Sequence, residues 1–423
     1  MKTKYYIICG KFFDGVEQRL RKNIKILVED ATITAVGESL VCPPDAQTVD
    51  LSQLTVTPGL IDSHVHFEFA APSNFNNFAV TDTDEMKTLA TVHNLAKSLR
   101  KGYTTIRTTG TAFQGFGMMD AKRAIERGWF AGSRFLVAPH ALGISGGHWD
   151  FSVFHARSNP YVSEFLEQRY AAAAGADAFK ALVRKQVKYG AEFIKIMAAG
   201  GFASPGDDPG QPQLDAEELR AIIDTAKSFN CPTLAHAYTS PVIDLLIDLG
   251  IDEIDHGTLM QSHTADLMEK NDIYLVPTIA SLMPPDSEID LSLVPPKSEA
   301  YIFKQERYAA QLEESRKTII DIIMNRNITV GLGSDLVAIY DNTDSWREFM
   351  AWVDIGIPPL RALVAATSSN ARICRLDHKI GTLKPGMLAD IAGWSLDIEK
   401  NKRALSKCDF VMKEGVIIAV SAV

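Results

Sequence analysis

Short runs of apolar and β-branched residues alternate with helical patterns between Pro58 and Lys379. Each run has the length of a β-strand, whereas the segments between the runs repeat their apolar residues with the period of an amphipathic helix. Two of these helices are expected at Asp84–Lys101 and Asp215–Phe229. The alternation predicts repeated βα units and a parallel sheet.

Eight strand runs can be counted in this region, which is the number of strands in a (β/α)8 TIM barrel. They are residues 60–67, 104–110, 135–141, 193–201, 232–238, 253–259, 273–280 and 329–335. Long loops follow the fourth and the seventh runs, at 200–215 and 281–300. Because both loops follow strands, we expect them at the C-terminal face, where barrel enzymes keep their active sites.

The two ends of the chain carry a different pattern, in which short strands are separated by Gly, Pro and Asp turns. We therefore expect an α/β protein with two units. Residues 1–57 and 380–423 would form a composite β-sandwich domain, and residues 58–379 would form the barrel.

Composition excludes several classes of protein. The 423 residues are 46% hydrophobic and 22% charged, as in a large globular enzyme. The net charge of -9 has no basic stripe, which argues against nucleic acid or an anionic membrane as a partner and leaves a small-molecule substrate. The five cysteines are widely spaced, and we find neither a signal peptide nor a long apolar run, so a cytoplasmic protein is expected.

The first candidate for chemistry is the pair His64 and His66 in the first strand run. Alternate residues of a strand point to the same face, so both imidazoles project together in a chelating arrangement. A single such pair is weak evidence for a metal, because packed or capped histidines also occur at this spacing.

Lys195 lies inside the apolar run Phe193–Met197, which a parallel barrel buries. An unpaired ammonium group in such a place is costly to desolvate. Reaction with carbon dioxide would convert the amine to a carbamate anion, whose two oxygens can each bind a cation. The alternative is a lysine whose ammonium group reaches the barrel mouth.

Further potential metal ligands stand at the ends of later strand runs. His236 and His256 end the fifth and sixth runs, and Asp335 closes the eighth. Neutral imidazole suits zinc, and a carboxylate can both bind a metal and accept a proton. The alternative for Asp335 is a turn or helix cap.

These motifs together resemble the amidohydrolase superfamily over nearly the whole chain. The matching pieces are VTPGLIDSHVH, FIKIMAAGG, LAHA, IDHGT, GLGSD and GTLKPGMLADIAGW. The resemblance implies two divalent metal ions, expected to be zinc, bridged by a hydroxide and by N6-carboxylysine at Lys195. One ion would be held by His64, His66, Lys195 and Asp335, and the other by Lys195, His236 and His256.

The segment ISGGHWD and the loop 200–215 resemble a narrower branch, the binuclear dipeptidases and carboxypeptidases related to prolidase-like and Xaa-Arg/Lys-cleaving enzymes. This resemblance implies that His148 and Tyr238 face the substrate, where they polarise the scissile carbonyl or grip a terminal carboxylate. Tyr238 is two residues beyond His236 and so shares its strand face. Many relatives have His-Ala-His where this chain has His-Ala-Tyr, which leaves the substrate class open.

The resulting hypothesis is a metallopeptidase-like hydrolase that cleaves a dipeptide or an N-acyl amino acid. Two cations would supply the bridging hydroxide, and Asp335 would move its proton to the leaving amine. One alternative is a cyclic-amide hydrolase or deaminase of the imidazolonepropionase-like type, which would employ a single metal. The other is a catalytically silent scaffold protein, against which the filled ligand positions argue.

Three more residues are candidates with open alternatives. His140, at the end of the third run, is expected either in the substrate pocket or in a structural role. Asp207 and Asp208 either attract a cationic group of the substrate or are merely solvated. Because similar proteins commonly form symmetric assemblies, we also expect a homo-oligomer.

Overall fold

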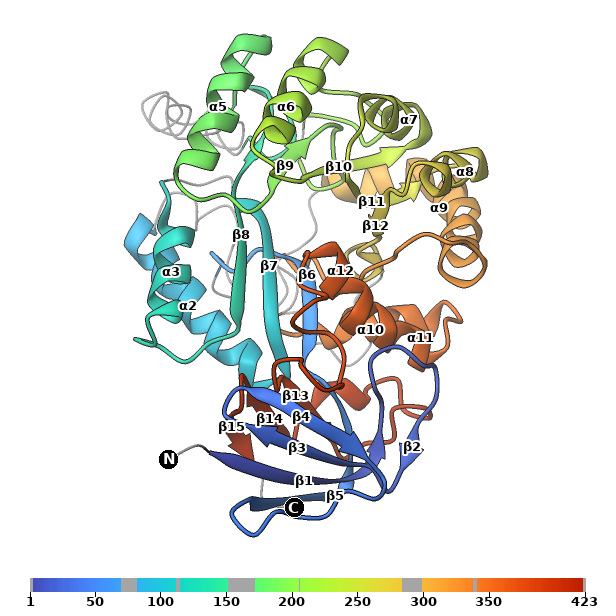
Figure 1. Ribbon diagram of the computed structural model, residues 1–423. Helices are drawn as coiled ribbons and strands as arrows, with labels where there is room; N and C mark the ends of the chain where they lie inside the picture. The colour runs from blue at the N-terminus through green and yellow to red at the C-terminus, as the bar shows by residue number, and fades with distance from the viewer. Residues whose placement is uncertain are drawn as a thin grey trace.

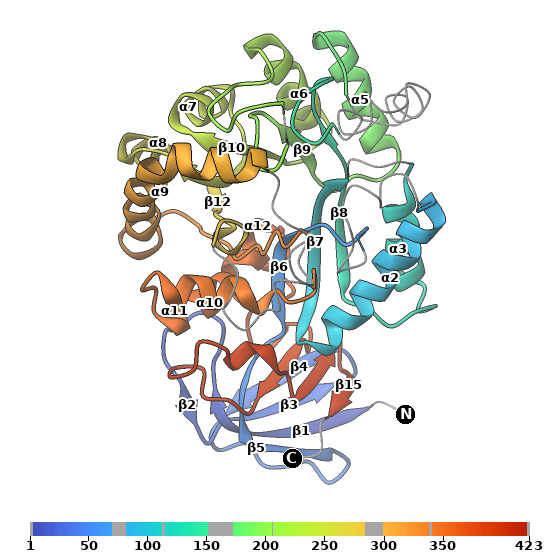
Figure 2. The same ribbon diagram turned by 180° about the vertical axis from the view of Figure 1, so that it is seen from behind.

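Two sheets organise the part of the chain that the computed structural model describes. It describes residues 3–69, 82–111, 115–150, 172–204, 206–283, 299–337 and 341–420. Figure 1 shows one sheet at the bottom of the molecule, beside both chain ends, with the strands and helices of the second unit above it. Figure 2 shows the same arrangement from behind.

The second sheet is parallel, has seven strands in the order β12-β11-β10-β9-β8-β7-β6, and forms a nearly closed TIM barrel. Its strands are β6 (Leu60–Val65), β7 (Tyr103–Thr111), β8 (Arg134–Leu142), β9 (Ile194–Met197), β10 (Thr233–Thr239), β11 (Glu253–Leu259) and β12 (Tyr274–Val276). The described helices are α2 (Asp84–Arg100), α3 (Gly117–Glu126), α5 (Ala176–Lys188), α6 (Ala216–Ser228), α7 (Ser240–Leu249), α8 (Ser262–Lys270), α9 (Glu299–Asn325), α10 (Trp346–Asp354), α11 (Pro359–Val364) and α12 (Asn370–Ile373), with short helical turns η2 (Ile279–Ser281), η4 (Ala365–Ser369) and η5 (Ala404–Ser406).

The eighth expected strand, residues 329–335, is not a regular strand, although it lies between β12 and β6. It forms one parallel bridge, Val330 with Leu275, and the Ser63 N–H donates to its Leu332 carbonyl at 3.1 Å. The Asn370 side chain also donates to the Leu332 carbonyl, at 2.7 Å. Backbone hydrogen bonds also join the segment to its neighbours, from Gly331 to Leu275 at 2.9 Å and from Asp335 to His64 at 2.9 Å. The segment is therefore hydrogen-bonded to both β12 and β6, although it is not a regular strand.

The two helices expected from the sequence are confirmed, with ends within one residue of the prediction. α2 begins after Thr83, whose hydroxyl accepts a hydrogen bond from the backbone of Met86. α6 begins after Asp215, which forms a reciprocal capping box with Glu218. Such caps satisfy backbone N–H groups that have no partner within the helix.

Strands from both chain ends share the other sheet, as expected. Its order is β15-β14-β13-β5-β1-β3-β4, with β2 paired to β1. The strands are β1 (Lys4–Phe12), β2 (Arg21–Lys22), β3 (Lys25–Glu29), β4 (Thr32–Gly37), β5 (Gln47–Pro58), β13 (Ile391–Trp394), β14 (Phe410–Lys413) and β15 (Val416–Val420). The second layer of a sandwich, and the domain boundaries near residues 57 and 380, stay predictions.

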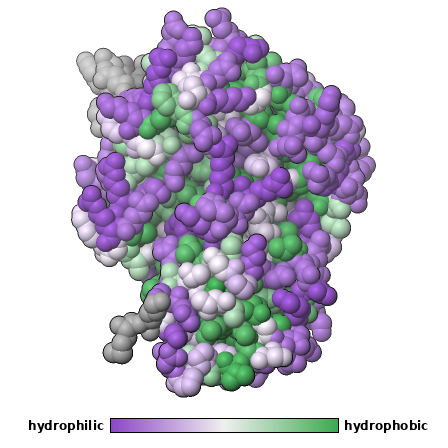
Figure 3. Space-filling view, in the orientation of Figure 1, coloured by the Kyte–Doolittle hydropathy of each residue, from purple (hydrophilic) through white to green (hydrophobic). Residues whose placement is uncertain are grey.

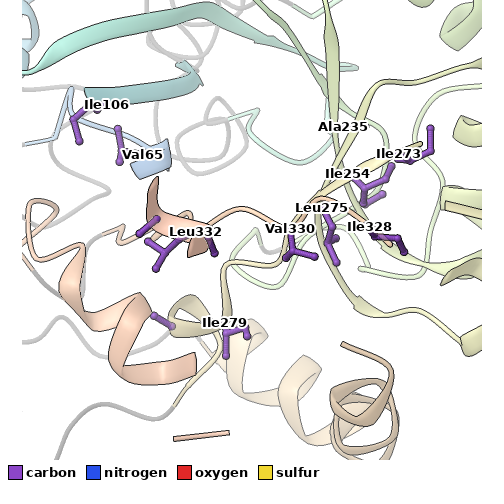
Figure 4. Packing of buried hydrophobic residues seen from close by; sticks show 14 of the residues in the cluster. Val65, Ile106, Ala235, Ile254, Ile273, Leu275, Ile279, Ile328, Val330 and Leu332 are labelled. Carbon is purple, nitrogen blue, oxygen red and sulfur yellow. The ribbon is translucent and has the colours of Figure 1, made fainter. Parts of the chain in front are cut away.

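The barrel core is built from aliphatic side chains on neighbouring strands. Figure 4 shows Leu275, Val330 and Ile254 grouped at the junction of β11, β12 and the eighth segment. On the face shown in Figure 3, hydrophilic residues cover much of the outer surface. Among the described helices, none has the length and hydropathy needed to cross a lipid bilayer.

Candidate active site

His64, His66 and Asp335 come together at one end of the barrel, and each can offer a ligand atom within 4.8 Å of the others. Asp335 Oδ1 lies 3.5 Å from His64 Nε2 and 3.4 Å from His66 Nε2. The eighth segment holds Asp335 there, because its N–H donates to the His64 carbonyl at 2.9 Å. Asp335 has a φ of 44°, a strained conformation that is often found at functional sites.

His236 and His256 form a second group, with His236 Nδ1 and His256 Nε2 2.8 Å apart. The other nitrogen of His256 lies 2.6 Å from the Thr278 hydroxyl. His256 also has a positive φ, of 74°, and its ring lies 5.4 Å from that of His64. The two groups of histidines therefore adjoin each other.

The ammonium nitrogen of Lys195 forms a buried ion pair with Asp255. Its charge is near enough to both groups to act with burial in lowering the pKa of His64, His236 and His256. The other oxygen of Asp255 is 3.1 Å from His64 Nδ1. Sequence reasoning missed Asp255, because adjacent residues of a regular strand point to opposite faces and His256 was assigned to the interior. The positive φ of His256 breaks this alternation, so that both side chains turn inward.

The protonation states of these groups suit a divalent metal. Burial lowers the pKa of His64 and of His236, and it lowers the pKa of His256 to about 3. Although burial opposes its ionisation, Asp335 has a pKa well below its usual range because of His64 and His66. Neutral imidazoles beside an ionised carboxylate are the donor set that zinc prefers.

The structure places both expected substrate residues against the histidine groups. The His148 ring stacks on His236 with centroids 4.3 Å apart, and the Tyr238 ring stacks on His256 at 4.9 Å. Burial raises the pKa of Tyr238 well above its usual value, so its phenol stays protonated and can donate a hydrogen bond. Trp149, which sequence reasoning did not single out, lies against His66 with ring centroids 4.6 Å apart.

His140 has contacts of another kind. Its Nδ1 lies 3.0 Å from the Gln186 side chain of α5, and its ring meets the edge of Phe116. These contacts are with the helical layer around the barrel and give no support to a role in substrate binding.

Asp207 and Asp208 are engaged by α9. Asp207 pairs with the buried Lys304 at 2.8 Å, and Asp208 pairs with Arg307 at 2.7 Å and accepts a hydrogen bond from Tyr308. Neither carboxylate is therefore merely solvated, because each already has a cationic partner in α9, and contact with a cationic substrate group stays a prediction. The α9 residues are about 100 positions away in sequence, so no local pattern shows this pairing.

Comparison with known proteins identifies the family of this chain. The family model described as "Amidohydrolase family" matches residues 55–421. The chain belongs to the amidohydrolase family. It is therefore a hydrolase that acts on amide bonds, in a family that is generally metal-dependent.

Several known proteins are similar to this chain over most of their length. An ochratoxinase of Aspergillus niger is 26% identical over 379 residues, which cover 86% of this chain and 75% of that protein. An imidazolonepropionase of Salinispora tropica is 24% identical over 401 residues, covering 88% and 86%. The structure of a prolidase complexed with N-methylphosphonate-L-proline is 26% identical, with a TM-score of 0.85 over 99% of this chain and 100% of that chain.

Proposed function

We propose that this amidohydrolase uses two divalent metal ions, zinc in the simplest case, to cleave the amide bond of a dipeptide or an N-acyl amino acid. The observation that carries the proposal is the pair of adjoining ligand groups, His64 with His66 and Asp335, and His236 with His256. Similarity to a prolidase and an ochratoxinase supports this class of substrate.

Lys195 would contribute to both metal positions as a carbamate. The carbamate nitrogen keeps one N–H, which can donate to Asp255, the partner of the amine. The modification would also replace a buried ammonium with an anion suited to two cations. When bound, such a metal pair lowers the pKa of a shared water and polarises a carbonyl.

The protein side chains then have separate tasks. Asp335 is an ionised carboxylate at the site and can accept a proton and deliver it to the leaving amine. Tyr238 can donate a hydrogen bond to the oxygen that becomes negative, because its phenol stays protonated. His148, stacked on His236, can contact the same carbonyl or the substrate carboxylate.

A substrate panel tests the proposal. Zinc-loaded enzyme is incubated with dipeptides, N-acyl amino acids and cyclic amides, and amine release is measured. We expect turnover of substrates with a free carboxylate and loss of turnover when that carboxylate is converted to an amide. Cleavage of cyclic amides alone would contradict the proposal and support the second candidate, an imidazolonepropionase-like enzyme, which the 24% identical relative favours.

A further inference from the structure

A hydrogen-bonded network of Ser204 and Asp207 meets the Nδ1 edge of His148. His148 Nδ1 lies 2.6 Å from the Ser204 hydroxyl and 3.4 Å from Asp207 Oδ2. Ser204 also donates to Asp207 Oδ1 at 2.6 Å. All three side chains are largely shielded from solvent.

The number of protons in the network fixes the tautomer of His148. A serine hydroxyl has one proton, and Ser204 gives it to Asp207, so its oxygen can only accept from His148. His148 must therefore carry a proton on Nδ1. Its Nε2 takes no part in the hydrogen bonds of this network.

Lys304 holds the Asp207 carboxylate of this network in place through an ion pair. Its three ammonium protons have three acceptors, Asp207 at 2.8 Å and the carbonyls of Gly201 and Ser204 at 2.7 and 2.6 Å. The backbone N–H of Gly201 also donates to Asp207, at 3.1 Å. Lys304 thus ties the loop after β9 to α9 at three points.

Gly201 packs against the imidazole ring of His148. A Cβ atom added at this residue would overlap the ring of His148, so the ring packs directly against the loop backbone. His236 covers the ring by stacking. His148 is therefore fixed in plane by packing and in tautomer by hydrogen bonds.

We infer that Asp207 is a positioning residue, held by Ser204 and Lys304, that orients His148 for its contact with the substrate. This inference rests on the proposed function. Asp207 does not serve as a subsite for a cationic group, because Lys304 already neutralises it. Preferences between substrate side chains must then arise elsewhere.

The experiment combines nitrogen NMR and kinetics on the zinc-loaded, full-length enzyme with 15N-labelled histidine. Loss of a signal in His148→Gln assigns His148, and we expect that signal to report the Nδ1–H tautomer. Asp207→Asn should change the tautomer populations, and should lower kcat/KM by up to about 100-fold, because a small displacement of a group that positions the substrate can cost this much. Asp208→Asn, in the same loop, is the matched control and should leave both unchanged.

A double variant separates positioning from a structural effect. If Asp207 acts through His148, adding Asp207→Asn to His148→Gln should cost nothing further, whereas independent effects would multiply. Ser204→Ala serves if Asp207→Asn does not fold, and should shift the His148 signal in the same direction. An unchanged His148 signal, or multiplicative losses, would overturn the inference. The NMR result needs no substrate, so failure of the proposed function shows separately as a lack of turnover by the unaltered enzyme.

Discussion

A buried ion pair below the site offers a direct test of how the barrel interior is stabilised. Arg107 on β7 is fully buried and forms two hydrogen bonds with Glu253 on β11, one of them 2.7 Å long. Its Nε also donates to the Ser63 carbonyl, next to His64, at 2.6 Å. Burial works against the charge, yet Glu253 raises the pKa of Arg107 above its usual value.

Glu253→Gln keeps the volume of the side chain and removes its charge. Two unit charges about 4 Å apart attract by about 4 kcal/mol at an effective dielectric constant of about 20. Loss of one partner of a buried pair costs about 3–5 kcal/mol, because the remaining charge stays buried without compensation. We therefore expect the free energy of unfolding, measured by urea denaturation at pH 7.5 without metal, to fall by about 3–5 kcal/mol.

Two controls accompany this measurement. The double variant Arg107→Met with Glu253→Leu removes both charges and should recover most of the loss. Asp120→Asn breaks the exposed pair with Arg123 and should cost less than about 1 kcal/mol. A loss below about 1 kcal/mol for Glu253→Gln would refute the reasoning, since it would mean that Arg107 finds compensation without its partner.

Two further predictions concern packing and pH. Gly201→Ala should displace His148 and lower kcat/KM by up to about 100-fold with zinc content unchanged, because a displaced site group loses its orientation toward the substrate. Gly206→Ala, whose added Cβ meets no atoms within 4 Å, should not. Although burial opposes it, hydrogen bonds led by that from Lys97 lower the pKa of Asp341 to about 2. A pKa that is lower in the folded than in the unfolded protein contributes stability above about pH 4, and this stability is lost as pH falls toward 2. Asp341→Asn should therefore lower the free energy of unfolding by about 1–2 kcal/mol at pH 7. It should also make the urea midpoint of unfolding fall less steeply at acid pH.

Each of these has a clear contrary result. Full activity of Gly201→Ala would mean that the position of the His148 ring does not depend on its packing against Gly201. An acid limb of equal slope in the variant and the unaltered protein would mean that Asp341 does not titrate with folding.

Local signals explain what the sequence could predict. Helices α2 and α6 follow from apolar periodicity and from caps formed within four residues, such as Asp215 with Glu218. The strand-end positions of His64, His66 and Asp335 follow from the rule that barrel enzymes place their chemistry at one face. Comparison with known proteins confirms the barrel and the family that these patterns indicate.

What the sequence could not predict depends on long-range contacts or unusual backbone conformations. Lys304 reaches Asp207 across 97 positions, so the loop acids could not be distinguished from solvated ones. Asp255 and its neighbour His256 both face the site because His256 has a positive φ, which no periodicity encodes. The eighth segment is hydrogen-bonded to β12 and to β6 but is not a regular strand, and its alternating sequence does not show this.

The most direct test of the proposed metal centre is carbon-13 NMR of the protein loaded with zinc in 13C-labelled bicarbonate. The account predicts one carbamate resonance, absent from Lys195→Ala and from protein prepared without zinc. A spectrum of the fully zinc-loaded, active enzyme without that resonance would show that Lys195 remains an amine, and would contradict the metal-bridging role proposed for it.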